Sequence, residues 1–402
     1  MTHVVVIGAG QAGASCAARL RSLGFDGRIT LIGEEHVPPY QRPPLSKKYL
    51  LGDMTQERLY LRPESFYGEN GIDLRLDETV RSIDRAGKTV ITSGGVLGYD
   101  QLVLTTGSVP RRLPAAIGGA LEGVYTVRGL TDVDAMAPEF VAGRRVLIVG
   151  GGYIGLEAAA VAASRGLDVT LVEMADRILQ RVAAPETSDF FRELHRSHGV
   201  KIVEGVGLER LTGAGRVDGA ILTDGRNVAL DFVIVGVGIT PATALAEAAG
   251  LELENGIRTD ALGRSSDPAI WAAGDCASFP YRGTRIRLES VPNAIDQAEL
   301  VAENIMGADK AYVAAPWFWS DQYDVKLQIA GLNTGYDRVV SRVGDRMSCS
   351  FWYYRGKTLL AVDAMNAARD YMIGKRLIES GISPTPEEVA NPETNLKALM
   401  RQ

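Results

Sequence analysis

The chain has 402 residues, too many for one ordinary hydrophobic core, so two or three domains are expected. Its 46% hydrophobic and 23% charged residues are typical of a soluble globular protein, and a net charge of -6 gives no reason to expect a nucleic-acid partner. No apolar run approaches the ~18 residues of a membrane span. The first apolar segment, from Val4, is needed for the fold and is not a signal peptide. We therefore expect a cytoplasmic protein with no membrane segment.

Two glycine-rich turns of the same design stand out. Each follows a short apolar run, precedes an expected helix and has the pattern G-x-G-x-x-G. In dinucleotide-binding folds the first glycine makes the turn, the second lets a pyrophosphate approach the backbone, and the third packs helix on strand. One such pattern is weak, but two in one chain, each with an acid after the next strand, predict two dinucleotide sites. The glycines are Gly8, Gly10 and Gly13 in the first turn and Gly150, Gly152 and Gly155 in the second.

An acidic residue follows the second expected strand of each unit, where a ribose would be held. Glu34 is the first carboxylate beyond the strand expected over 28–32, although an ordinary loop acid is the alternative. Glu173 ends the strand expected over 168–172. There it would bond a ribose 2′-hydroxyl and repel a 2′-phosphate, which favours NADH over NADPH. Arg177 lies too late to replace it.

A rigid loop, Tyr40 to Lys47, follows the first unit. Its two consecutive prolines fix the backbone and hold Arg42 and Lys47 in defined positions, so both are candidate cofactor ligands. Ser46 could cap a following helix. Asp275, after an apolar stretch and Gly274, is expected either to bind a sugar-like hydroxyl chain or to cap the next helix.

A helix is expected over 294–306, and the pattern changes after it. Within about 317 to 402, polar and apolar residues alternate over 326–330 and in parts of 347–354 and 358–362. This predicts a small antiparallel sheet with one solvated face, then a helix over 367–380. The dense aromatic run over 316–323 that opens this segment is more often packing than chemistry.

The cysteines and histidines give no metal or redox motif. Cys16, Cys276 and Cys349 are far apart and are expected to be reduced, mostly buried thiols. His195 and His198 share a helix face, but no third ligand is near, so a solvated helix end is favoured over a metal site.

Together these stretches resemble the FAD-dependent ferredoxin reductases of bacterial monooxygenase and dioxygenase systems, closest to the putidaredoxin reductase type. The resemblance covers nearly the whole chain. Its most specific parts are the proline loop and the aromatic run over 316–323, with further matches over 8–13, 105–107, 150–157, 236–241, 273–275 and 289–293.

The resemblance implies an α/β flavoprotein of glutathione-reductase-like architecture, with two Rossmann-type dinucleotide-binding domains and a C-terminal α+β domain. The FAD-binding domain would be discontinuous, over 1–109 and 239–316. The NADH-binding domain would span 110–238 and the C-terminal domain 317–402.

The resemblance also implies roles for individual residues. Lys47 would lie near the reactive edge of the isoalloxazine, Glu157 would meet the nicotinamide carboxamide or pair with Lys47, and Tyr153 would move aside when nicotinamide stacks on the flavin. These three are the candidate catalytic residues. The implied FAD ligands are Gly8, Gly10, Gly13, Glu34, Arg42, Lys47, Thr106, Gly107, Asp275, Val291 and Trp319. The implied NADH ligands are Gly150, Gly152, Gly155 and Glu173.

The implied activity is that of an NADH-dependent ferredoxin reductase. Hydride passes from NADH to bound FAD, and single electrons then pass to a two-iron ferredoxin that feeds a P450-type monooxygenase or a dioxygenase. Because ferredoxins are usually acidic, the cluster Arg282, Arg285 and Arg287 is a candidate docking patch, with a solvated hairpin as an equal alternative.

Two other functions remain as alternatives. An NADH oxidase, peroxidase or disulfide reductase of this fold would need a cysteine at the flavin, and the loop over 40–47 has none. A disulfide reductase would also need a C-terminal histidine, whereas no histidine follows His198. A redox-signalling flavoprotein, as in the related apoptosis-inducing factors, would be expected to carry targeting segments or long insertions.

Overall fold

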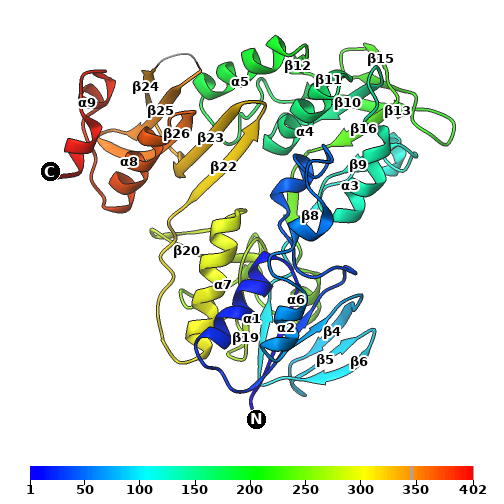
Figure 1. Cartoon of the computed structure of the whole chain (residues 1–402), viewed down its shortest axis with the longest axis vertical. Helices are drawn as coiled ribbons and strands as arrows, with labels where there is room; N and C mark the ends of the chain where they lie inside the picture. The colour runs from blue at the N-terminus through cyan, green and yellow to red at the C-terminus, as the bar shows by residue number, and fades with distance from the viewer. Residues whose placement is uncertain (345–346, 402) are drawn as a thin grey trace. The chain divides into compact units, whose positions relative to one another are not determined.

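The computed structural model describes residues 1–344 and 347–401, which form two compact units (Figure 1). The first unit comprises Met1–Gln41, Thr55–Val109 and Ile239–Pro316. The second comprises Arg42–Met54, Pro110–Gly238 and Trp317–Gln402. No helix in the described part of the chain is long and apolar enough to cross a membrane.

The first unit is built on a parallel sheet of five strands. Their order is β19 (Ile270–Ala272), β7 (Gln101–Leu104), β1 (His3–Ile7), β2 (Arg28–Ile32) and β3 (Ile72–Arg75). Helices α1 (Gln11–Ser22) and α7 (Val291–Ile305) lie side by side on one face, where the small residues of α1 allow close approach (Figure 1). The other face is covered by an antiparallel sheet of β4 (Val80–Asp84), β5 (Thr89–Thr92) and β6 (Gly95–Gly98).

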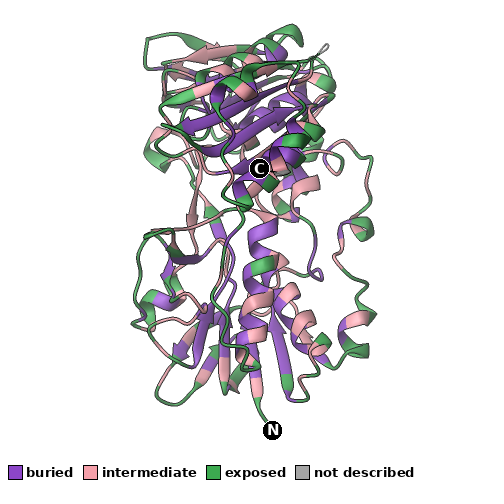
Figure 2. Ribbon diagram, turned by 90° about the vertical axis from the view of Figure 1, so that its left-hand side faces the viewer, coloured by how far each residue is buried: buried purple, intermediate pink, exposed green. Residues whose placement is uncertain are grey.

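Strand β1 is a continuous apolar run because it is buried on both faces. Val4 and Val6 face the helices, whereas Val5 and Ile7 face the second sheet, so both faces of the strand are buried. Figure 2 shows buried strands in the unit that carries the N-terminus. The remaining elements of this part are α2 (Ser65–Glu69), α6 (Ala244–Ala248), β8 (Ser108–Pro110), β17 (Ile239–Pro241), β18 (Ile257–Arg258), β20 (Ala277–Tyr281) and β21 (Thr284–Ile286).

Helix α7 begins three residues before the expected start at Ala294. Ser290 is its N-cap and accepts a hydrogen bond from the Asn293 amide at 3.3 Å, and Pro292 lies in the first turn. A serine followed by a first-turn proline is a helix-start signal, so the earlier start was readable from the sequence.

The second unit contains another parallel sheet of five strands. Their order is β12 (Lys201–Glu204), β11 (Asp168–Glu173), β10 (Arg145–Val149), β16 (Phe232–Val235) and β9 (Val124–Thr126). Its helices are α3 (Leu130–Met136), α4 (Tyr153–Ser164) and α5 (Pro185–Ser197). A small antiparallel sheet adds β13 (Leu208–Thr212), β14 (Gly219–Leu222) and β15 (Asn227–Ala229).

The C-terminal part of the second unit is an antiparallel sheet followed by helices α8 (Ala368–Glu379) and α9 (Pro386–Ala390). The strand order is β22 (Trp317–Gln322), β23 (Val325–Gly331), β26 (Thr358–Met365), β25 (Cys349–Arg355) and β24 (Arg338–Val343). The predicted antiparallel pairing and the helix after it are present.

The predicted solvated face of this sheet is wrong for its central strands. Both β25 and β26 are buried along almost their whole length. Trp352 and Tyr354 pack against the α8 side, whereas Tyr353 points the other way and meets Thr187 on α5. The second face therefore meets the start of α5, which comes from a distant part of the sequence, and local alternation does not reveal this contact.

A buried carboxyl, Asp363, joins β26 to α5. It accepts hydrogen bonds from the Thr187 hydroxyl at 2.7 Å and from the Tyr353 hydroxyl. Burial raises the pKa of Asp363 to about 6. Because the folded state holds this proton more tightly than the unfolded state, Asp363 stabilises the fold most at low pH and loses that contribution as pH rises through about 6.

We expect Asp363→Asn to gain stability relative to the wild type as pH rises from 3.5 to 7, by about 3 kcal/mol. Asparagine keeps an acceptor oxygen for Tyr353 and Thr187 but does not ionise. The measurement is the free energy of unfolding of both proteins in denaturant across this pH range. A difference between the two that stays constant with pH would contradict the assignment.

Candidate functional site

The first glycine turn is shaped by close backbone approach. Gly8 has φ +110°, and a Cβ there would lie 2.2 Å from the Thr105 carbonyl oxygen. A Cβ at Gly13 would lie 2.0 Å from the Gly8 carbonyl oxygen, whereas one at Gly10 would meet nothing within 4 Å. The outer glycines are thus required by the packing of the protein itself, while the middle glycine faces open space. This is the arrangement that lets a phosphate reach the backbone.

The second glycine turn repeats the same geometry. A Cβ at Gly150 (φ +108°) would lie 2.4 Å from the Gly236 carbonyl oxygen, and one at Gly155 would lie 2.1 Å from that of Gly150. Gly152 again faces open space. The middle glycines are the N-caps of α1 and α4, and neither cap has a side-chain hydrogen bond, so the first amides of both helices remain available for an anion.

Three groups predicted to bind FAD follow neighbouring strands of the first sheet. Gly8 follows β1, Thr106 follows β7, and Asp275 follows β19, so all lie beyond the carboxyl edge where ligands bind in such sheets. The Thr106 hydroxyl donates to the Ala242 carbonyl at 2.6 Å. Gly107 has φ +70°.

The helix-capping role considered for Asp275 is wrong. The chain after Asp275 turns into strand β20, not a helix. The Asp275 carboxylate accepts a hydrogen bond from the Ser108 hydroxyl at 2.8 Å. Glu34 lies exposed in the loop after β2, and Val291 is the first residue of α7.

Glu173 is the last residue of β11 and lies against the second glycine turn. Its carboxylate accepts hydrogen bonds from the Gly151 amide at 2.6 Å and from the Ala175 amide at 2.8 Å. The Arg177 guanidinium is turned away, since it donates to the Ser188 hydroxyl at 2.5 Å and to the Ala183 carbonyl at 2.8 Å. The end of this strand therefore presents an anion, and its nearest arginine in sequence is occupied elsewhere.

Lys47 and Glu157, two of the predicted catalytic residues, form a salt bridge in the second unit. The Lys47 Nζ lies 2.8 Å from Glu157 Oε2. Glu157 lies on α4 and is only 2% exposed, while Lys47 is partly exposed. The pairing that the resemblance implied is thus present. A partly exposed cation on a buried carboxylate is held in one place, which suits a group that stabilises charge on a ligand.

Two serines complete the shell of Glu157. The Ser46 hydroxyl donates to Glu157 Oε2 at 2.8 Å, and the Ser320 hydroxyl donates to Glu157 Oε1 at 2.7 Å. The capping role considered for Ser46 is therefore wrong: it ends a 3₁₀ turn, Pro43–Ser46, and its hydroxyl is used by Glu157. Neither serine was predicted as a site residue.

A signal for Ser320 was present in the sequence. Ser320 and Gln322 occupy alternate positions of β22, so both point to the same face, and both are buried. Two polar residues at alternating positions inside an aromatic run indicate a buried polar face. This polar face is overlooked when only the aromatic residues of the run are considered.

The other predicted residues of the second unit lie nearby in the fold. Tyr153 lies one helical turn before Glu157 on α4, and its ring centre is 5.0 Å from that of Phe318. Trp319 is half-buried on β22. The Arg42 guanidinium donates to the Arg128 carbonyl at 2.8 Å.

The predicted solvated helix end is wrong for His195, which is fully buried. Its Nε2 lies 2.8 Å from Gln322 Oε1, and burial lowers its pKa to about 4. His198 is exposed and stacks on Tyr323 with ring centres 3.7 Å apart. Among the described residues, no group of three His, Cys, Asp or Glu side chains is placed to hold a metal ion.

The arginine cluster over 282–287 is mostly not free to dock a partner. Arg285 donates to the Thr259 and Ser278 carbonyls, and Arg287 donates to the Asp275 carbonyl and pairs with Glu289 at 2.6 Å. Only Arg282 of the three is exposed, at the turn of the hairpin.

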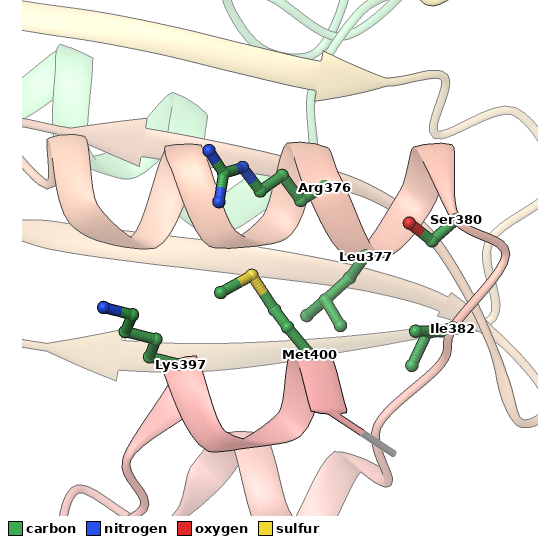
Figure 3. A pocket seen from close by; sticks show the side chains of 6 residues that line it. All are labelled: Arg376, Leu377, Ser380, Ile382, Lys397 and Met400. Atoms are coloured by element: carbon green, nitrogen blue, oxygen red, sulfur yellow. The ribbon is translucent and has the colours of Figure 1, made fainter.

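A pocket in the C-terminal part lies between α8 and the last turn of the chain (Figure 3). None of the predicted site residues lines it, and its two cationic residues have no acid, histidine or cysteine beside them in the lining. The lining residues are Arg376, Leu377, Ser380, Ile382, Lys397 and Met400.

The second glycine turn supports a paired substitution test. Gly152→Ala adds a methyl group where only open space lies, so we expect a stability loss of about 1 kcal/mol or less but NADH binding at least about tenfold weaker. Gly150→Ala should destabilise the fold by on the order of 3 kcal/mol, because its Cβ would clash with backbone. Thermal unfolding and NADH titration measure the two effects. Unchanged NADH affinity in Gly152→Ala would remove this turn from the site.

Comparisons with known proteins agree with this geometry. Residues 2–298 match the family model described as pyridine nucleotide-disulphide oxidoreductase, and residues 317–400 match the model described as reductase C-terminal. A ferredoxin–NAD(P)(+) reductase of a Sphingomonas species is 45% identical over 409 residues, covering 99% of this chain and 98% of the relative. The ferredoxin reductase subunit of a 5,5′-dehydrodivanillate O-demethylase from a Sphingobium species is 43% identical over 403 residues, covering 98% and 97%.

Among solved structures, the chain is similar to the reductase in a covalent putidaredoxin reductase–putidaredoxin complex. The TM-score is 0.96 at 39% identity, covering 100% of this chain and 98% of the other. These findings confirm the predicted resemblance and fold class. The chain belongs to the pyridine nucleotide-disulphide oxidoreductase family, and within it to the oxidoreductases of the ferredoxin reductase type.

Proposed function

We propose that this chain is an FAD-dependent ferredoxin reductase that draws electrons from NADH and passes them singly to a two-iron ferredoxin serving an oxygenase. The observation that carries the proposal is the burial of all three cysteines, Cys16, Cys276 and Cys349. Burial raises the pKa of Cys16 to about 12 and that of Cys349 to about 11, and it also raises the pKa of Cys276. Buried thiols with raised pKa are inert. With no thiol in the chain to take the electrons, an external acceptor is required, as in the ferredoxin reductases to which it is similar.

Residues 1–109 and 239–316 form the FAD-binding domain in this proposal, 110–238 the NADH-binding domain and 317–402 the C-terminal domain. The open space at Gly10 and Gly152 fits two pyrophosphates. When bound, FAD supplies the exchange between two-electron donors and one-electron acceptors. The chain would hold it through the FAD ligands implied by the resemblance and would hold NADH through the second turn and Glu173.

The preference for NADH over NADPH rests on Glu173 and Arg177. A carboxylate held against the glycine turn would accept a bond from a ribose 2′-hydroxyl and repel a 2′-phosphate. Arg177, the first arginine after the strand, already donates to Ser188 and Ala183. A 2′-phosphate would therefore meet an anion without a compensating cation from this segment.

Lys47 is proposed to supply a fixed positive charge near the reactive edge of FAD. Its bond to Glu157 removes most of the rotamer freedom of a long side chain. Glu157 and Tyr153, from the same helix, are proposed to contact the nicotinamide side. A cytoplasmic location stays a prediction.

The purified, FAD-loaded protein should reduce cytochrome c with NADH at least about tenfold faster when a two-iron ferredoxin is added, because the ferredoxin carries the single electrons. NADPH should be a poorer donor than NADH by at least about tenfold in kcat/KM. Steady-state absorbance assays measure both. Turnover that is indifferent to ferredoxin would contradict the proposed function, and equal use of NADPH would contradict only the cofactor preference.

Lys47→Ala should slow reduction of the bound FAD by NADH at least about tenfold, a barrier increase of about 1.4 kcal/mol, because the fixed positive charge is lost. Stopped-flow measurement of flavin bleaching gives the rate. Lys48→Ala is the matched control, since Lys48 is the adjacent lysine and is exposed. If Lys47→Ala is reduced as fast as Lys48→Ala, Lys47 has no role in this step.

A further inference from the structure

A buried chain of hydrogen bonds leads from Glu157 into the C-terminal sheet and on to α5. Ser320 donates to Glu157 Oε1 at 2.7 Å, Gln322 Nε2 donates to the Ser320 hydroxyl oxygen at 3.2 Å, and His195 Nε2 lies 2.8 Å from Gln322 Oε1. All four side chains are at most 2% exposed. They come from α4, β22 and α5, segments far apart in the sequence.

Each hydrogen bond in this chain has a defined direction. The Gln322 carbonyl oxygen can only accept, so the neutral His195 ring must donate to it from Nε2. The Gln322 amide then faces the Ser320 oxygen and donates to it. Ser320 has one hydroxyl proton, and with its oxygen already receiving a bond, that proton is directed to Glu157.

Tyr323, at the end of the hydrogen-bond series away from Glu157, supports the same tautomer of His195. Its second ring nitrogen, Nδ1, lies 3.3 Å from the Tyr323 hydroxyl, which can donate to it. A ring that donates at Nε2 and accepts at Nδ1 is a neutral histidine. The orientation of Ser320 is thus set from a point well away from Glu157.

Glu157 needs this support because it is a buried carboxylate that also has to hold Lys47. Oε2 receives Ser46 and Lys47, and Ser320 is the donor to Oε1. Without a donor, Oε1 would lose a charge-assisted hydrogen bond in a site with little access to water. The carboxylate could then rotate, and Lys47 would move with it.

We propose that Ser320, directed by Gln322 and His195, is a positioning residue that fixes the Glu157 carboxylate and through it the Lys47 ammonium group. In this proposal the three residues act through Glu157 and are assigned no contact with either cofactor. This inference rests on the proposed function only in assigning Lys47 to the reaction of NADH with FAD. The hydrogen-bond chain itself can be tested independently of activity.

The first test is a double-mutant cycle on the holoprotein, read as the free energy of unfolding in denaturant. Ser320→Ala alone should destabilise the protein, and the same change in a Glu157→Ala background should have less than half that effect, because the acceptor is gone. Ser350→Ala is the matched control. Ser350 is equally buried in the same sheet and donates to Asp370, so its effect should be unchanged by Glu157→Ala. Equal effects of Ser320→Ala in both backgrounds would overturn the hydrogen-bond assignment.

The second test is the rate of flavin bleaching by NADH. Ser320→Ala should slow it about fivefold or more without changing the Kd for NADH, and Ser350→Ala should not slow it. Ser320→Thr keeps the hydroxyl and should retain at least about half of the wild-type rate. If Ser320→Ala does not fold, Gln322→Met interrupts the chain one link further on and should give the same loss.

The two proposals fail in different ways. A wild-type protein that NADH does not reduce would contradict the proposed function. The double-mutant cycle would still test the hydrogen bond between Ser320 and Glu157. A wild type that is reduced rapidly, with Ser320→Ala or Gln322→Met indistinguishable from Ser350→Ala, would overturn the positioning role alone.

Discussion

The buried carboxylate of Glu157 is the constraint on which much of the second unit depends. An ionised group at 2% exposure is costly unless hydrogen bonds and a counter-charge surround it. Glu157 draws these partners from two separate segments: Ser46 and Lys47 from the loop over 42–54, and Ser320 from β22. Together with the hydrogen bonds from Arg42 to the Arg128 carbonyl and from Tyr49 to Asp134, these bonds join the short loop Arg42–Met54 to the second unit, although the chain on both sides of it belongs to the first. The site is thus assembled by residues distant in sequence that hydrogen-bond or pair with the Glu157 carboxylate.

The glycine turns impose a second constraint, which acts on the start of α4. Gly150 and Gly155 must lack side chains because backbone oxygens lie where a Cβ would be, and this fixes the first turn of the helix on β10. With the helix start fixed, Tyr153 and Glu157 are one turn apart and emerge on adjacent positions of one face. The turn that shapes the nucleotide cradle therefore also sets where the buried carboxylate lies. Binding geometry and charge placement are coupled through one helix.

The sequence was sufficient for features that depend on local pattern. Apolar runs, glycine spacing and the acid after each second strand located β1, β10, both turns and Glu173, because these signals lie within about 30 residues of one another. Prediction from the sequence failed where the residues that bury a side chain come from a distant part of the sequence. His195 lies at the end of an amphipathic helix and was expected to be solvated, but Gln322 and Tyr323 cover it. Likewise, β25 and β26 were expected to have a solvated face, yet both are buried almost throughout, and Thr187 of α5 meets their second face. Tertiary burial of polar residues leaves little trace in a local pattern.

The series of buried hydrogen bonds from His195 to Glu157 also suits the protein to electron transfer. A thiol acceptor would require an exposed cysteine with a lowered pKa, whereas every cysteine here is buried and its pKa is raised. In the proposed site the protein instead has the Lys47 ammonium group, paired with the Glu157 carboxylate, which accepts hydrogen bonds from Ser46 and Ser320. A fixed cation of this kind would stabilise negative charge on a bound flavin without forming a covalent bond to it. No side chain would have to change its redox state. When bound, FAD would supply the exchange between the electron pair from NADH and the single electrons that a ferredoxin accepts.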